Sequence, residues 1–333
     1  MEPPVTARHL TPTLLLLPVG ALILAGCAQG SAQSPQEQQN PDAIEVVATT
    51  NVYRDIAQRI GADRVQATEI ISSPAQDPHS YEPTARDKLT ISKAEVVLAN
   101  GGGYDAFMDQ LISSMPSEQV AQQIHAVDTS PEAVEESAEA GHDEQGEHEH
   151  EHGGHEGHQH AGYNEHVWFD LDSMQALGER LASEFGKLDP QHAEQFQANA
   201  EQFSTELQEL KDRAAAAGLD GKSFAMTEPV PFYLLKDAGM HDATPQGLSE
   251  AVEAGGDIPP QTLKKMNDAL ADGQIDLLAY NIQTEGHDSV AIRSTAEAHS
   301  VPVVDFAETM GPDEDYVGWM GAQVDDLAAA AGK

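Results

Sequence analysis

Cysteine is almost absent from this sequence: a chain of 333 residues contains one, Cys27. Intrachain disulfides are therefore excluded, and the stability of the fold has to come from a buried core. A chain of this length can bury such a core in one large or two medium domains.

Basic residues are scarce, with 17 Lys plus Arg against 56 Asp plus Glu and a formal net charge of -39. Between Ala94 and Glu179 there is not one Lys or Arg. Binding to nucleic-acid phosphates needs clustered basic side chains that displace counterions, so a nucleic-acid partner is excluded. The acidity suits a protein that stays soluble outside the cytoplasm or attracts cations.

Common catalytic signatures are also missing. The sequence has no nucleophile elbow, no phosphate-binding loop and no helical HExxH zinc motif. We therefore predict a binding protein and not an enzyme.

The one cysteine ends the pattern Leu24-Ala25-Gly26-Cys27, directly after an apolar segment that begins near Leu14 and follows Arg8. This segment is too short to span a bilayer comfortably, and small residues before a cleavage point are typical of an export signal. We predict a lipoprotein signal peptide over residues 1–26, lipidation of Cys27 and a flexible, Gln- and Ser-rich tether over 27–43. The alternative is an ordinary cysteine buried in a core helix.

Strands and helices alternate along the rest of the chain, which predicts an α/β fold with mainly parallel sheets. A helical stretch from Gln191 to about Ala217 repeats apolar residues every three or four positions and is long enough to connect two lobes. We predict an N-terminal α/β lobe over 44–188, a linking helix over 189–218 and a C-terminal α/β lobe over 219–333.

A low-complexity insert over 131–162 interrupts the N-terminal lobe. It has no apolar periodicity and predicts a disordered loop. Neutral imidazoles coordinate metals, so we expect the loop to be an auxiliary metal-binding segment that binds more weakly than a rigid site. Its seven histidines are His142, His148, His150, His152, His155, His158 and His160.

Two histidines outside the insert are candidate metal ligands. His79 lies in Asp77-Pro78-His79-Ser80-Tyr81-Glu82-Pro83, where two prolines stiffen the loop before an ion arrives. His166 lies beside an apolar aromatic cluster, where a part-buried ring would be neutral. Each could instead be an ordinary hydrogen-bonded histidine, and the nearby Asp170 could simply cap a helix.

Carboxylates follow two predicted strands of the C-terminal lobe. Glu228 lies between a strand and a helix, so it is either a ligand or a helix N-cap. The segment from Tyr280 to Asp288 offers several donors, of which Glu285 is the first choice and Asp288 the second.

Together these motifs resemble the cluster A-I zinc- and manganese-binding lipoproteins of ABC importers. The resemblance rests on Pro-His-x-Tyr-Glu-Pro around His79, His-x-Trp at His166, Thr-Glu-x-x-x-Phe-Tyr at Glu228 and the lipobox, and it covers residues 44 to 330. It implies two lobes bridged by a rigid helix, with one ion in the cleft held by His79, His166, Glu228 and a fourth ligand, Glu285 or Asp288.

The resemblance also implies the cargo, the partners and the location. Glu228 in place of a third histidine moves the preference toward Mn2+, whereas the histidine-rich insert suits Zn2+, so we expect Zn2+ with Mn2+ possible. The partners would be a membrane permease and its ATPase. The protein would be a monomer, lipid-anchored on the extracytoplasmic face of a bacterial cell membrane.

Two other functions remain open. A metallohydrolase would hold a catalytic zinc with an open water position and would need a nearby general base, such as Glu82 or Asp288. A secreted metal buffer or adhesin would use the insert and need no importer.

Overall fold

The computed structural model describes residues 40–116, 121–132 and 163–332 of the chain. The predicted signal peptide, Cys27, most of the predicted tether and the seven histidines of the insert lie outside these described residues. Within them no helix is long and apolar enough to cross a membrane.

The N-terminal lobe is built around one sheet. Strand β1 forms because it is a run rich in β-branched residues that is buried almost throughout. Its helices and strands are β1 (Ile44–Thr50), α1 (Asn51–Gly61), the short turn η1 (Ala62–Arg64), β2 (Val65–Ile71), α2 (Ala85–Ile91), β3 (Val96–Ala99), α3 (Ala106–Ser113), β4 (Gln122–His125), the turns η3 (Ala126–Thr129) and η4 (Val167–Phe169), and α5 (Leu171–Leu188).

The C-terminal lobe repeats this alternation. Helix α6 leads into it and α11 closes the chain. Its elements are α6 (Ala193–Ala215), β5 (Ser223–Met226), α7 (Phe232–Asp237), β6 (His241–Asp242), α8 (Ser249–Glu253), α9 (Pro260–Ala271), β7 (Leu277–Asn281), α10 (His287–Ala298), β8 (Val303–Phe306) and α11 (Tyr316–Ala331).

Both sheets have the same topology. The strand orders are β2-β1-β3-β4 and β6-β5-β7-β8, and every pairing in them is parallel. The carboxyl ends of parallel strands share one edge of a sheet, where open α/β folds place their ligands. The predicted fold class, two parallel-sheet lobes joined by a long helix, is confirmed.

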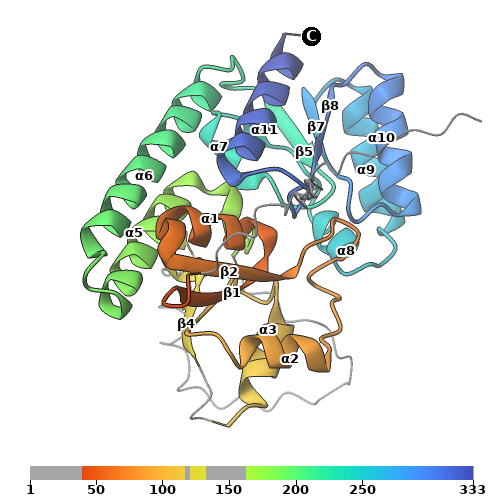
Figure 1. Cartoon of the computed structure of the whole chain (residues 1–333). Helices are drawn as coiled ribbons and strands as arrows, with labels where there is room; N and C mark the ends of the chain where they lie inside the picture. The colour runs from red at the N-terminus through yellow and green to blue at the C-terminus, as the bar shows by residue number, and fades with distance from the viewer. Residues whose placement is uncertain (1–39, 117–120, 133–162, 333) are drawn as a thin grey trace, which may run out of the picture. The chain divides into compact units, whose positions relative to one another are not determined.

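Helix α6 connects the lobes because it packs against elements of both, α1 and α5 on one side and α7 and α11 on the other. Figure 1 shows it running beside α5 along one flank. Its buried residues recur every three or four positions, as in Phe196, Ala200 and Phe203. These side chains belong to one core cluster that extends from β1 to α11, so apolar burial stabilises the two lobes as one unit.

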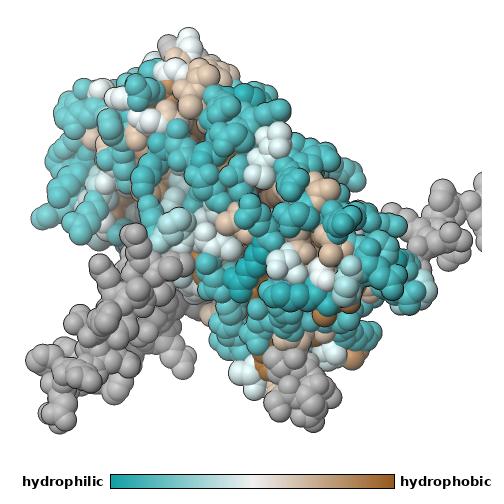
Figure 2. All heavy atoms as spheres, turned by 90° about the vertical axis from the view of Figure 1, so that its left-hand side faces the viewer, coloured by the Kyte–Doolittle hydropathy of each residue, from teal (hydrophilic) through white to brown (hydrophobic). Residues whose placement is uncertain are grey.

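Side-chain caps set the start of two helices. Thr84 caps α2 in a capping box with Asp87, and Asp170 accepts hydrogen bonds from the first backbone amides of α5. Three short elements have no periodic signal and were not predicted: the polar strand β4, the two-residue strand β6 and helix α8. The face drawn in Figure 2 is largely hydrophilic, which agrees with the acidic composition.

Candidate metal centre

His79 is held in the loop between β2 and α2. Its backbone amide donates to Asp77 Oδ1 at 2.9 Å, which closes a tight turn next to Pro78. The imidazole packs edge-on against the ring of Tyr104, with 4.9 Å between the centroids, and its side chain is 9 % exposed. The loop thus fixes this ring before any ligand binds.

His166 is almost fully buried just before η4. Its Nδ1 lies 2.7 Å from Asn164 Oδ1, and because an amide oxygen only accepts, Nδ1 carries the proton of the neutral ring. Nε2 is then the unprotonated nitrogen, which is the form that coordinates metals. The ring of Trp168 packs edge-on against this imidazole, with 5.1 Å between the centroids.

The segment that carries His166 is anchored to the end of β3. Asn100 donates from Nδ2 to the carbonyl oxygen of Glu165 at 3.0 Å. A Cβ at Gly102, where φ is +71°, would lie 3.1 Å from Glu165 Cβ, so glycine permits both the turn and this close approach.

Two carboxylates reach the centre from the C-terminal lobe. Glu228 lies two residues beyond β5 and Glu308 two residues beyond β8, and both are buried. Asn281, the last residue of β7, donates from Nδ2 to both, at 2.8 Å to Glu308 Oε1. One amide therefore ties the two carboxyl groups together at the carboxyl edge of the sheet.

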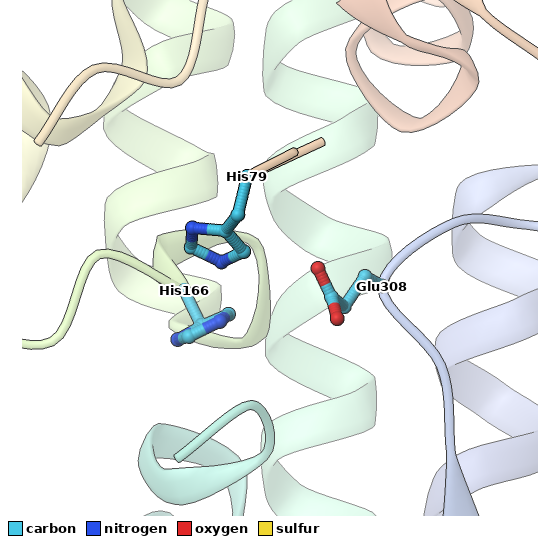
Figure 3. Close-up of side chains that lie close together, drawn as sticks. All are labelled: His79, His166 and Glu308. Atoms are coloured by element: carbon cyan, nitrogen blue, oxygen red, sulfur yellow. The ribbon is translucent and has the colours of Figure 1, made fainter. Parts of the chain in front are cut away.

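Three residues from both lobes converge on one space. Ligand atoms of His79, His166 and Glu308 all lie within 4.8 Å of one another, and Figure 3 shows the three side chains turned toward each other. Two donors that each bind one ion at about 2.1 Å can be no more than about 4.2 Å apart. Three donors that surround one ion in tetrahedral geometry lie about 3.4 Å apart, so a contraction of roughly an ångström would bring this group around a single Zn2+ or Mn2+ ion.

A second group uses His79 with Glu165 and Glu253, again with ligand atoms within 4.8 Å of one another. Glu253 ends α8, and its Oε1 lies 4.0 Å from His79 Nε2 and 3.9 Å from His166 Nε2. Two imidazoles are thus surrounded by the carboxylates of both lobes.

The acidic groups are held together at an electrostatic cost. Burial, followed by repulsion from Glu228, raises the pKa of Glu308 to about 8. Burial likewise raises the pKa of Glu228 to about 7, and burial with repulsion from Glu165 raises the pKa of Glu253 to about 9. A divalent cation would relieve this repulsion, so the donor set fits a metal better than it fits the metal-free state.

The two other predicted candidates lie apart from these groups. Glu285 is exposed and accepts a hydrogen bond from the Tyr280 hydroxyl at 2.9 Å, while Asp288 accepts from the Ile258 amide at 3.1 Å. Glu285 and Asp288 lie after Asn281, at the start of α10, and their carboxylates accept hydrogen bonds from Tyr280 and Ile258. Glu228 belongs to neither three-residue group, but its carboxylate accepts a hydrogen bond from Asn281, which also donates to Glu308.

Glu308 and Glu253 were not selected from the sequence. Glu308 had a usable signal, since Glu228 and Glu308 each stand two residues after a strand end. Glu253 had none, because α8 is too short to leave a periodic pattern.

Hydrogen bonds between the lobes keep the centre closed. Gln283 donates from Nε2 to the carbonyl of Pro74 at 3.0 Å, while its Oε1 accepts from the amide of Thr309 at 2.9 Å. This one side chain therefore connects the loop before His79 to the loop that carries Glu308.

Comparison with known proteins gives consistent matches. Residues 46–330 match the model of a family described as zinc-uptake complex component A, periplasmic. The manganese ABC transporter substrate-binding lipoprotein PsaA of Streptococcus pneumoniae is 22% identical over 96% of this chain and 98% of its own. The manganese-binding lipoprotein MntA of Halalkalibacterium halodurans is 25% identical, but the match covers only 58% of this chain and 54% of that protein.

Solved structures show the same fold. The solute-binding protein FpvC of Pseudomonas aeruginosa, solved in complex with Mn2+, superposes with a TM-score of 0.66 at 21% identity. The match covers 87% of this chain and 98% of FpvC.

Proposed function

This chain belongs to the family of periplasmic zinc-uptake complex component A proteins, and from that membership we propose that it captures Zn2+ outside the cytoplasm and delivers it to an ABC importer. The observation that carries the proposal is the convergence of His79, His166 and Glu308 from two lobes on one buried space. Such a cleft can hold an ion and release it when the lobes separate.

The ligand set we propose is His79, His166, Glu228 and Glu308. The sequence favoured Glu285 or Asp288 as the fourth ligand, but the position of Glu308 beside both imidazoles supports Glu308 in that role. Two imidazoles with two carboxylates neutralise a divalent ion and accept either Zn2+ or Mn2+. Zn2+ binds more tightly to most such sites, and the histidine-rich insert adds imidazoles that suit it better than Mn2+.

We propose that the protein is a binding protein and not a hydrolase. Its family and named relatives are uptake and substrate-binding proteins, which supports this assignment. A permease and its ATPase would be the partners, as for ABC importers in general. The lipobox supports cleavage after residue 26, lipid anchoring through Cys27 and attachment to the extracytoplasmic membrane face. Residues 27 to 43 would be the tether of a protein that acts as a monomer.

Two measurements test this proposal. Titration of the purified protein against a competing chelator should show one tight site for Zn2+ and a weaker one for Mn2+, with extra weak sites that disappear when residues 131–162 are deleted. A strain lacking the protein should grow poorly in chelated medium and recover when zinc is added. Normal growth of that strain, or turnover of an ester, peptide or phosphate abolished by His79→Ala, would contradict the proposal.

A further inference from the structure

We propose that Glu253 is itself a ligand of the cargo metal, supplied by the short helix α8 as a carboxylate additional to Glu228 and Glu308. This inference rests on the proposed function, because it concerns the same ion. The distances of 4.0 and 3.9 Å from Glu253 Oε1 to the Nε2 atoms of His79 and His166 carry it. Both are below the limit of about 4.2 Å for two donors that share one ion.

The surroundings of Glu253 support a ligand role. Its side chain is 8 % exposed, and Oε1 makes no hydrogen bond with any residue that the structure describes. A buried carboxylate oxygen without a donor loses its hydration and gains nothing in return, so such groups are paired or coordinate metals. Its Oε1 lies near both imidazoles, and an ion between them would give this oxygen the partner that it lacks among the described residues.

The alternative explanation is an ion pair with a protonated histidine. Nδ1 of His166 donates to Asn164 Oδ1, so Nε2 is the ring atom left to meet Glu253, whose Oε1 lies 3.9 Å away. A metal ion supplies the positive charge without a protonated ring. The group of His79, Glu165 and Glu253 also places this carboxylate beside a second possible ion position.

Helix α8 separates two hollows in the surface. One has a volume of about 370 Å³ and lies against Asp77 and Gln283, and the other has a volume of about 600 Å³ and lies against Tyr163 and Pro229. Glu253 lines both. This carboxylate is therefore reachable from both hollows.

A carboxylate beyond Glu228 and Glu308 has a consequence for selectivity. It makes the ligand set harder and raises the coordination number above the four that Zn2+ prefers. Mn2+ accepts oxygen-rich, higher-coordinate sites more readily. Loss of Glu253 should therefore weaken Mn2+ binding more than Zn2+ binding.

The test compares Glu253→Gln with Glu250→Gln in the full-length protein. Glu250 lies on the same helix but is exposed, so it is a matched control for charge. Chelator competition should show Mn2+ binding at least about tenfold weaker in E253Q, a smaller change for Zn2+ and little change in E250Q. With Co2+ as a probe, visible absorption should intensify in E253Q as the coordination number falls.

The outcomes separate this inference from the proposed function. If the unaltered protein binds neither Zn2+ nor Mn2+, the proposed function fails. A different result would overturn only the role of Glu253. In that case the unaltered protein binds both metals and the His79→Ala variant binds neither, but E253Q has the same affinities and the same Co2+ spectrum as the unaltered protein. If E253Q folds poorly, Glu253→Asp replaces it, because this variant keeps the charge but moves the carboxylate away from the imidazoles. Unchanged Mn2+ affinity and an unchanged Co2+ spectrum in Glu253→Asp would also contradict the proposal.

Discussion

The two lobes share one strand order but bring different chemistry to the centre. The N-terminal lobe supplies both imidazoles, His79 and His166, each packed against an aromatic ring. The C-terminal lobe supplies Glu228, Glu253 and Glu308, two of them joined by the amide of Asn281. Glu165 adds a carboxylate from the N-terminal side.

This difference assigns a separate task to each lobe. Aromatic rings pack against both imidazoles and fix their orientation, so the N-terminal donors are positioned before a metal arrives. Burial and mutual repulsion raise the pKa of the C-terminal carboxyl groups, so these must lose protons when a metal binds. Metal affinity should therefore depend on the positions of the imidazoles in the N-terminal lobe and on the protonation of the carboxyl groups in the C-terminal lobe.

Removing an imidazole should have the largest effect. Structural zinc sites contribute about 10–16 kcal/mol from four ligands, so His79→Ala should weaken Zn2+ binding by about a hundred- to a thousandfold. Chelator competition measures this change. His287→Ala is the matched control, because the side chain of His287 is 97% exposed. Equal affinities for the two variants would show that the N-terminal imidazole does not bind the ion.

A change of pH should have the next largest effect. Each proton displaced by the metal changes affinity by about tenfold per pH unit only below the pKa of its group. From pH 9 to pH 7, Zn2+ binding should therefore weaken by about tenfold for Glu308 alone, and by roughly a hundredfold or more when Glu228 and Glu253 also lose protons. This range lies above the ordinary pKa of histidine, about 6.5, and reports the carboxyl groups. A Kd independent of pH after correction for zinc hydrolysis would contradict proton displacement.

The same carboxyl groups should make metal-free stability fall as pH rises. Their pKa is raised in the folded state, so the folded protein binds more protons than the unfolded one between about pH 4.5 and 9. The stability they contribute is present below the unfolded pKa and is lost as pH rises through the folded pKa values. Thermal melting should therefore show a lower Tm at pH 9 than at pH 7 without metal and a larger gain on adding Zn2+ at pH 9.

Replacing one C-terminal carboxylate should have an intermediate effect. Glu308→Gln keeps the shape and an amide oxygen but removes the charge, so Zn2+ binding should weaken by about thirtyfold, roughly 2 kcal/mol. Glu285→Gln is the control, since Glu285 is exposed and bonded to Tyr280. Calorimetric titration of both variants identifies the fourth ligand, and a larger loss in E285Q than in E308Q would restore the first choice made from the sequence.

Most of the fold could be predicted from the sequence because its signals are local. The apolar repeat from Gln191 to about Ala217 predicts a long helix, and the structure has α6 at Ala193–Ala215. Strand β4 could not be predicted, because its sequence Gln-Gln-Ile-His has no alternating apolar pattern and only its Ile is fully buried.

The sequence predicts the N-terminal residues of the candidate site better than the C-terminal ones. Prolines and aromatic residues next to His79 and His166 mark unusual loops that one sequence can reveal. Glu308 lies in a loop with many acidic neighbours, and only the parallel pairing of β7 with β8 brings it to the Asn281 side chain. The position of Glu308 beside Asn281 therefore depends on the sheet register, although Glu308 follows β8 by the same two residues as Glu228 follows β5.

Removing the Asn281 amide that holds Glu228 and Glu308 together should have the smallest effect on metal affinity. In Asn281→Ala, Glu228 and Glu308 lose their shared donor and can move apart, so Zn2+ binding should weaken by about tenfold, as for the loss of other partners of metal ligands. Asn267→Ala on α9 is the control. Because Asn281 acts through Glu308, the double variant with Glu308→Gln should lose less affinity than the sum of the single free-energy losses. Strict additivity would mean that the amide contributes to the fold of the C-terminal lobe and not to the position of its ligand.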